Sequence, residues 1–203
     1  MLKLAKERKA EWDSMMKNAI FEATMAVLSE HGFEGLRMDR VAKTAEVSTG
    51  TLYNYFKNKD ELLLHVLDTR FEPIYQNFLK ILNSDMSPPE KLEASVRELL
   101  TTIKEQLSLI IIIDSAEGHS LPIKIGANEK RESIHTIFAD IINEGIEQGL
   151  FRPFDSQRTA RLIFGAVKGL TQSRIEGNVE PLISETDIFE CMDLFFSGLN
   201  TKG

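Results

Sequence analysis

The chain has little cysteine, histidine or tryptophan for its 203 residues: one cysteine, four histidines and one tryptophan. A single thiol, Cys191, cannot form an intramolecular disulfide, and this excludes folds that depend on such bridges. Sparse cysteine is typical of proteins in a reducing compartment. Cys191 falls on the apolar side of a predicted helix, where we expect an unreactive, buried thiol.

Long hydrophobic runs are missing as well. The strongest apolar run, "LSLIIII" at 107–113, is far shorter than the roughly 20 residues that span a bilayer. The N-terminal segment "MLKLAKERKAEWD" is too charged for a signal peptide, which needs an apolar run after its basic start. These absences predict a soluble, cytoplasmic protein that does not interact with membranes.

Motifs of enzymatic chemistry are not found either. The four histidines, at positions 31, 65, 119 and 135, do not have the spacing of metal ligands. Neither GxxxxGK nor GxGxxG occurs, so the common phosphate-cradling and dinucleotide-binding loops are not predicted. We therefore predict no catalytic residues, no metal, no cofactor and no enzymatic activity.

Charge is unevenly distributed along the chain. The net charge is −7, yet residues 1–62 carry ten basic and ten acidic side chains and are neutral. The whole excess of negative charge therefore lies in residues 63–203. Such asymmetry suggests that the two parts of the chain meet different partners.

The pattern of apolar residues has the period of α-helices almost throughout, and it predicts an all-α fold of about nine helices. The run at 107–113 could also form a buried strand, but helix is favoured because no other segment offers a partner strand. Pro73 should kink or break its helix near residues 71–72. The other predicted helices cover 13–31, 38–45, a short segment after Ser48, 59–82, 88–106, 134–149, 156–175 and 185–199.

Capping residues mark the ends of these helices. Glycines expected just beyond a C-terminus, in the left-handed conformation, are Gly32 and Gly149. Side chains expected to cap an N-terminus are Ser48, Asn58, Ser87, Asp155 and Ser184.

Residues 38–56 have the layout of a helix-turn-helix, whose second helix enters the major groove of DNA. The groove side of such a helix needs small or hydrogen-bonding residues. The inner side needs apolar residues, which Leu52 and Phe56 can supply. Tyrosine hydroxyls and lysines at the rim can hold phosphates without reading sequence. Residues suited to the groove side are Thr49, Gly50, Thr51 and Asn54.

The stretch "GFEGLRMDRVAKTAEVSTGTLYNYFKNKDELL" resembles the DNA-binding signature of the tetracycline-repressor (TetR) family of bacterial regulators. The resemblance implies phosphate contacts for Tyr55 and Lys59, and Arg37 and Lys57 are added because of their charge. Ser48, the expected cap, completes the predicted DNA-binding set. The residues that the resemblance places in or beside the major groove are Thr49, Gly50, Thr51, Tyr53 and Asn54.

Two positions depart from the family pattern. Leu36 and Arg37 stand where the family usually has Thr or Ser capping the first helix of the motif, so we expect Asp39 to take part in the cap. Glu46 stands where the turn usually has glycine. A non-glycine residue is strained there if its φ is positive.

The resemblance also implies a DNA-binding domain at 1–60 and a domain at 61–203 that binds a small molecule and dimerises through its last two helices, about 156–175 and 185–199. Small residues in the first of these helices, such as Gly165 and Gly169, suit close helix approach. An apolar cavity between the middle helices would favour a lipophilic, fatty-acyl or aromatic ligand. Predicted lining residues are Phe78, Leu79, Leu109, Ile110, Ile113, Phe138, Ile142 and Phe164, with Asp114, His135, Gln172 and Arg174 as polar candidates.

Together these features predict a homodimeric transcriptional regulator, a repressor that binds palindromic operator DNA and is released by a small molecule. A second interpretation stays open, in which the chain is a helical ligand-binding or protein-interaction module without DNA binding. A titration against DNA at several salt concentrations separates the two.

Overall fold

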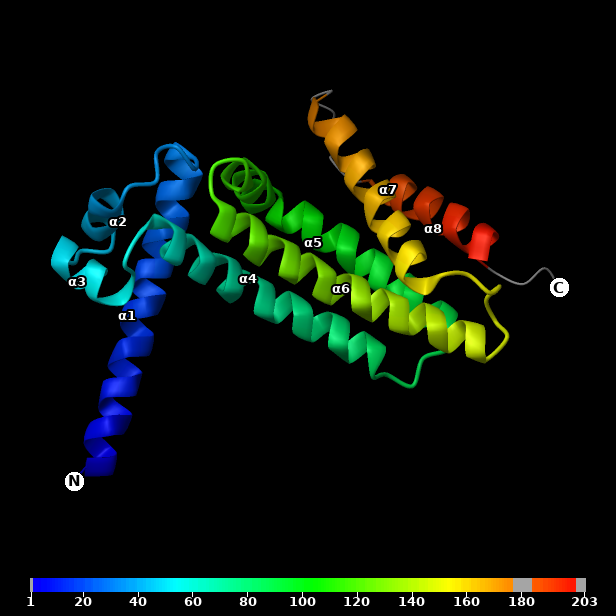
Figure 1. Cartoon of the computed structure of the whole chain (residues 1–203), viewed down its shortest axis with the longest axis horizontal. Helices are drawn as coiled ribbons and strands as arrows, with labels where there is room; N and C mark the ends of the chain where they lie inside the picture. The colour runs from blue at the N-terminus through cyan, green and yellow to red at the C-terminus, as the bar shows by residue number, and fades with distance from the viewer. Residues whose placement is uncertain (1, 177–183, 200–203) are drawn as a thin grey trace. The chain divides into compact units, whose positions relative to one another are not determined.

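The computed structural model describes residues 2–176 and 184–199 of the chain, and its elements there are eight α-helices (Figure 1). Their bounds are α1 Leu2–His31, α2 Met38–Thr44, α3 Thr49–Tyr55, α4 Lys59–Leu82, α5 Pro88–Glu117, α6 Leu121–Glu147, α7 Ser156–Glu176 and α8 Glu185–Leu199.

The all-α prediction is confirmed, and the differences lie at helix ends. The segment 107–113 is helical but continues α5, which accounts for one helix fewer than the predicted nine. Helix α1 begins at Leu2, well before the predicted start at residue 13. Its first turns are rich in Lys, Glu, Ala and Leu, which favour helix by propensity. The apolar stripe used for the prediction does not reach them.

Capping explains the other helix ends. The backbone N–H of Gly32 donates to Leu28 at 2.9 Å with φ at 63°, the left-handed ending expected of a C′ glycine. Gly149 has φ at 72°, and the following N–H donates to Gly145 at 2.9 Å, which completes a Schellman motif. The Asp155 carboxylate accepts from the N–H of Arg158 at 2.9 Å, as predicted.

Pro73 lies inside α4 without ending it. A break does not occur, because the helix continues on both sides of the missing N–H, and the predicted kink stays a prediction. Pro73 nevertheless lies close to the boundary between two compact units of the chain. The described chain forms two compact units, and the boundary within α4 falls between Arg70 and Phe71.

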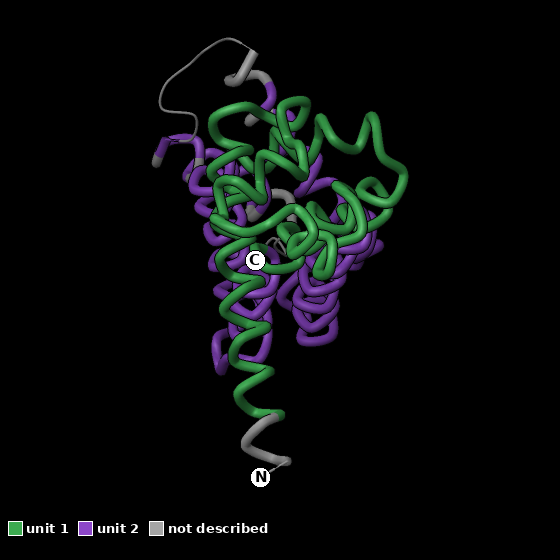
Figure 2. The backbone as a smooth tube through the Cα atoms, turned by 90° about the vertical axis from the view of Figure 1, so that its left-hand side faces the viewer, with its two compact units in different colours: residues 1–70, 108–127 green, residues 71–107, 128–203 purple. Residues whose placement is uncertain are grey.

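Unit 1 comprises Met1–Arg70 and Ser108–Ala127, and unit 2 comprises Phe71–Leu107 and Asn128–Gly203 (Figure 2). Helices α4, α5 and α6 each contribute residues to both units. The boundary predicted at residue 60 concerns function, which the compact units do not test, and it stays a prediction.

Each unit has its own apolar core. Unit 1 packs α1, α2 and α3 together with parts of α4, α5 and α6, and its most buried side chains include Ile20, Leu28, Val41, Leu52, Leu62, Leu63, Val66 and Ile123. The core of unit 2 includes Phe78, Leu92, Val96, Leu100, Phe138, Ile141, Ile142, Phe151, Ala160 and Ile163.

Aromatic rings and one ion pair organise the interior of unit 2. The ring centroids of Phe78 and Phe138 are 5.9 Å apart, and those of Phe138 and Phe164 are 5.0 Å apart. The buried ammonium of Lys91 donates to the Glu144 carboxylate at 2.9 Å and joins α5 to α6. Among the helices described, none combines the length and apolar character that crossing a membrane requires.

Candidate nucleic-acid interface

The turn between α2 and α3 is a Schellman motif with glutamate at its left-handed position. The N–H of Glu46 donates to the Lys43 carbonyl at 3.2 Å, and that of Val47 donates to Ala42 at 3.0 Å. These are the two hydrogen bonds of the motif, and Glu46 is its C′ residue. Its φ is 56°, so the backbone of Glu46 has the positive, strained φ considered for a non-glycine residue at this position.

Helix α3 has separate inner and outer faces. At its start, the Ser48 hydroxyl accepts a hydrogen bond from the N–H of Thr51 at 2.9 Å, as the capping prediction requires. Leu52 and Phe56 are buried against α1 and its neighbours, which confirms their predicted packing role. The residues exposed on the outer side are Thr49, Gly50, Tyr53 and Asn54, whereas Thr51 is half-buried.

Gly50 has no packing requirement within the protein. A Cβ at this position would meet only the Ser48 hydroxyl, at 3.8 Å. A small residue on an exposed helical face suits close approach by an external partner.

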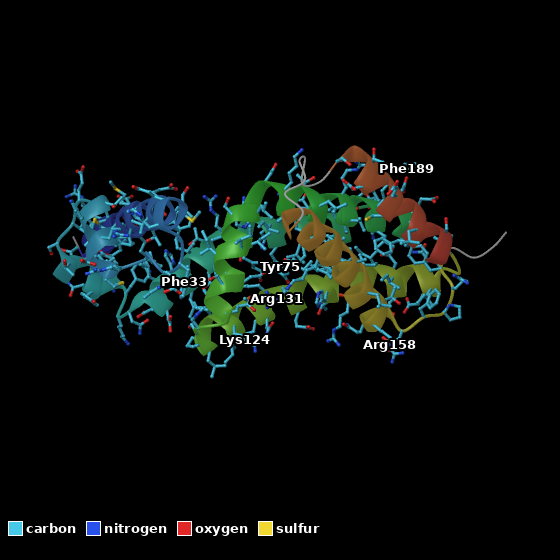
Figure 3. All side chains as sticks on the ribbon, turned by 90° about the horizontal axis from the view of Figure 1, so that it is seen from above. Phe33, Tyr75, Lys124, Arg131, Arg158 and Phe189 are labelled. Atoms are coloured by element: carbon cyan, nitrogen blue, oxygen red, sulfur yellow. The ribbon has the colours of Figure 1, made fainter. Side chains whose placement is uncertain are left out.

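Tyr55 and Lys59 both have partners within unit 1. The Tyr55 hydroxyl donates to the Asp13 carboxylate at 3.0 Å, which ties the end of α3 to α1. The Lys59 ammonium donates to the Phe33 carbonyl at 2.7 Å and lies 3.6 Å from the centre of the Phe33 ring, labelled in Figure 3. Burial lowers the pKa of Lys59, and burial together with Asp13 raises the pKa of Tyr55.

Tyr55 therefore ties α3 to α1, and Lys59 ties the start of α4 to the turn after α1. Their contacts with phosphate stay predictions. Sequence reasoning did not find Asp13 or Phe33 as supports of this surface. Asp13 precedes Tyr55 by 42 positions, and neither residue stands in a pattern that signals the contact.

Arg37 precedes α2 without capping it. Its guanidinium instead donates two hydrogen bonds to the Asp39 carboxylate, at 3.1 and 3.0 Å. Hydrogen bonding from Arg37 is the main reason why the pKa of Asp39 lies below its usual value, and a hydrogen bond from the N–H of Arg40 contributes less. Asp39 lies in the first turn of α2, where negative charge favours the helix dipole. A phosphate contact from Arg37 would compete with this exposed ion pair.

The N-terminus of α4 is capped by side chains. The Asn58 carbonyl oxygen accepts from the N–H of Glu61 at 2.8 Å, and the Glu61 carboxylate accepts from the N–H of Lys57 at 2.7 Å. The predicted cap is confirmed, and the side chain of Lys57 is exposed to solvent. Lys57 stays a candidate phosphate contact on charge alone.

Comparison with known proteins assigns the chain to a protein family. Its residues 20–66 match the model "Bacterial regulatory proteins, tetR family", and residues 85–172 match "Tetracyclin repressor-like, C-terminal domain". The HTH-type transcriptional regulator YhgD of Bacillus subtilis is 30% identical over 149 residues, covering 71% of this chain and 76% of that protein. This chain belongs to the TetR family of DNA-binding transcriptional regulators. The TetR family consists of regulators rather than enzymes, and the DNA-binding interpretation is therefore preferred to the module without it.

Two other similar proteins have names or ligands that refer to fatty acids. The fatty acid metabolism regulator protein of Bacillus subtilis is 25% identical over 150 residues, covering 73% of this chain and 77% of that protein. The solved structure of the transcriptional regulator FadR from Bacillus subtilis in complex with stearoyl-CoA has a TM-score of 0.76 at 22% identity. The match covers 89% of this chain and 97% of that one, and it shows the shared fold.

The predicted ligand-binding residues divide between the two units. Leu109 and Ile113 are buried in the core of unit 1, and Ile110 is half-buried. The rest belong to unit 2, where Phe78, Phe138 and Ile142 are buried and Leu79 and Phe164 are partly buried. Their role in binding a ligand stays a prediction.

The polar candidates for the ligand site differ in their surroundings. His135 hydrogen-bonds Glu132 at 3.3 Å, its ring lies edge-on to Phe164 with centroids 4.3 Å apart, and burial lowers its pKa. Asp114 and Gln172 are exposed. The side chain of Arg174 lies outside the described residues. Within the described part of the chain, no group of His, Cys, Asp and Glu side chains is arranged to hold a metal ion.

Proposed function

We propose that this TetR-family regulator is a repressor that binds palindromic operator DNA as a dimer and loses affinity for it when a long-chain fatty-acyl thioester binds to its C-terminal bundle. The outer face of α3 carries the DNA-binding part of this proposal. It presents an unobstructed glycine, an exposed tyrosine and exposed hydrogen-bonding side chains, while its inner face is fixed by buried Leu52 and Phe56.

The ligand class is supported by two observations. The packed interior of unit 2 includes phenylalanine, isoleucine and leucine, an apolar environment that favours an acyl chain over a sugar. A relative at 25% identity is named a fatty acid metabolism regulator, and a protein of the same fold was solved with stearoyl-CoA. A polar head group would need charged or polar partners near the edge of this apolar cluster.

The dimer is supported by apolar side chains that stay in solvent on the last two helices. Leu162 on α7 is 66% exposed, and Phe189 and Leu194 on α8 are 71% and 68% exposed. Phe189 is labelled in Figure 3. Gly165 and Gly169 are exposed on α7 and would meet no atom if a Cβ were added. A second chain covering these residues would remove apolar surface from water and could place two α3 helices roughly 34–36 Å apart, one turn of DNA.

Release by ligand requires a route from unit 2 to the recognition helix, and α4 offers one. It carries Phe78 in the core of unit 2, and its first residue, Lys59, is bonded to Phe33 in unit 1. An acyl chain that displaces the Phe78 ring would shift α4 and with it the position of α3. Coupling of about 1–3 kcal/mol, a 5- to 150-fold change in DNA affinity, is typical of such linkage.

The DNA-binding proposal is tested with an operator obtained by selection from random or genomic DNA. Tyr53→Ala should weaken binding to it at least tenfold in a gel-shift titration, because it removes an outer contact of α3. Phe154→Ala is the control, since Phe154 is an aromatic of comparable exposure in unit 2 (43% against 49%). Equal affinities for the two variants would refute the assignment of α3.

The ligand proposal is tested on the same operator complex by adding stearoyl-CoA, with free coenzyme A as the control. Affinity for the operator should fall 5- to 150-fold with the thioester and stay unchanged with coenzyme A alone. A complex that withstands saturating stearoyl-CoA would exclude this ligand class. The same result would leave the DNA-binding part intact.

A further inference from the structure

The N-terminal half of α1 extends beyond the packed core of unit 1. Residues 6–19 are exposed except for the half-buried Asp13 and Met16, and the matched DNA-binding model begins only at residue 20. In Figure 1 this part of the helix projects past α2 and α3. An isolated helical segment gains little stability without packing, so the core of unit 1 does not explain why the helix continues.

One face of this segment is basic. With about 100° of rotation per residue, Lys6, Lys9 and Lys17 all lie within about 40° of the direction of Asp13. All three lysines are exposed. The acidic residues of the segment, Glu7 and Glu11, lie at least about 120° away from that direction. The basic face therefore meets solvent without acidic neighbours on the same side of the helix, apart from Asp13.

Asp13 fixes where this face points. Its carboxylate accepts the hydroxyl of Tyr55, the last residue of α3, at 3.0 Å. The lysine face of α1 is therefore the side of α1 on which the recognition helix ends. Along the helix axis, Lys9 lies about 6 Å and Lys6 about 10 Å beyond Asp13 towards the N-terminus. A lysine side chain from either position can reach past the end of α3.

We propose that Lys6 and Lys9 contact the phosphate backbone of the operator beside the groove segment bound by α3. The inference rests on the proposed DNA-binding function and extends the contact surface of each protomer to α1. Exposed lysines complement a phosphate backbone, and such contacts add affinity without sequence preference.

The experiment measures operator affinity over a series of salt concentrations for the full chain and its single variants. Each phosphate contact contributes about 0.9 to the slope of log K against log salt. Lys6→Ala and Lys9→Ala should each make the slope shallower by about 1.8 in a dimer, since two protomers lose one contact each. Hydroxyl-radical footprints of these variants should lose protection at one edge of each half-site.

Arg8→Ala is the matched control, because Arg8 is an exposed cation on the same segment but lies about 140° from Asp13 around the helix. Its slope and footprint should equal those of the unsubstituted protein. Unchanged slopes for both lysine variants, or an equal change for Arg8→Ala, would overturn the inference. Absence of operator binding by the unsubstituted protein would instead contradict the proposed function itself.

Discussion

Replacing Glu46 by glycine should stabilise the protein, because the turn between α2 and α3 holds this glutamate at a φ of 56°. The left-handed conformation costs an ordinary L-residue about 1–2 kcal/mol, and glycine adopts it freely. Glycine also loses more backbone entropy on folding, which offsets about 0.5–1 kcal/mol of the gain. The difference spans about 0–1.5 kcal/mol, and we expect Glu46→Gly to raise the free energy of unfolding by an amount near the middle of that range.

Glu46→Ala separates strain from charge, since alanine removes the carboxylate but keeps the strained φ. Urea unfolding followed by circular dichroism should place the glycine variant above both the alanine variant and the unsubstituted protein. The alanine variant should be no more stable than the unsubstituted protein. A glycine variant that is no more stable than the alanine variant would refute the argument from backbone strain.

Three further substitutions test the contacts inside the two units. Breaking a buried ion pair typically costs roughly 3–5 kcal/mol. Lys91→Met should lower the free energy of unfolding by about the lower end of that range or less, because Glu144 keeps 33% of its side chain exposed. Adding Glu144→Gln to the same chain should recover part of the loss, as measured by urea unfolding. Tyr55→Phe should cost about 0.5–1.5 kcal/mol, and in a double-mutant cycle Asp13→Asn should add little further loss to it. Burial lowers the pKa of His135 below 6.5 in the folded state, so on acidification the unfolded chain takes up this proton first. The melting temperature should therefore fall as the pH drops below about 6.5. His135→Gln should flatten that part of the profile of melting temperature against pH, and an unchanged profile would contradict the assignment.

Periodicity and capping were sufficient to predict most of the fold. Apolar residues recurring at helical spacing located the helices, and Ser48, Asn58, Gly32 and Gly149 marked ends that the structure reproduces. The same reasoning missed the first eleven residues of α1, because their helicity depends on propensity rather than on a buried face. It also allowed for a break in α4 at Pro73, where the helix in fact continues.

The candidate site was predictable in outline only. The inward placement of Leu52 and Phe56 followed from the spacing of the motif. The anchoring of Tyr55 by Asp13 and of Lys59 by Phe33 did not, because such contacts join residues far apart in the chain. A hydroxyl or an ammonium assigned to DNA by sequence alone can equally be satisfied by the protein, and only coordinates distinguish the two.

The division of labour on α3 has a consequence for how such regulators diverge. Leu52, Tyr55 and Phe56 pack or bond α3 to the rest of unit 1, whereas Tyr53 and Asn54 are exposed to solvent and contribute little to packing. If these outward residues contact DNA as proposed, their substitution would alter operator preference at little cost in folding stability. Duplicated copies of the gene could acquire new DNA targets by changes at these positions while the scaffold beneath them is conserved.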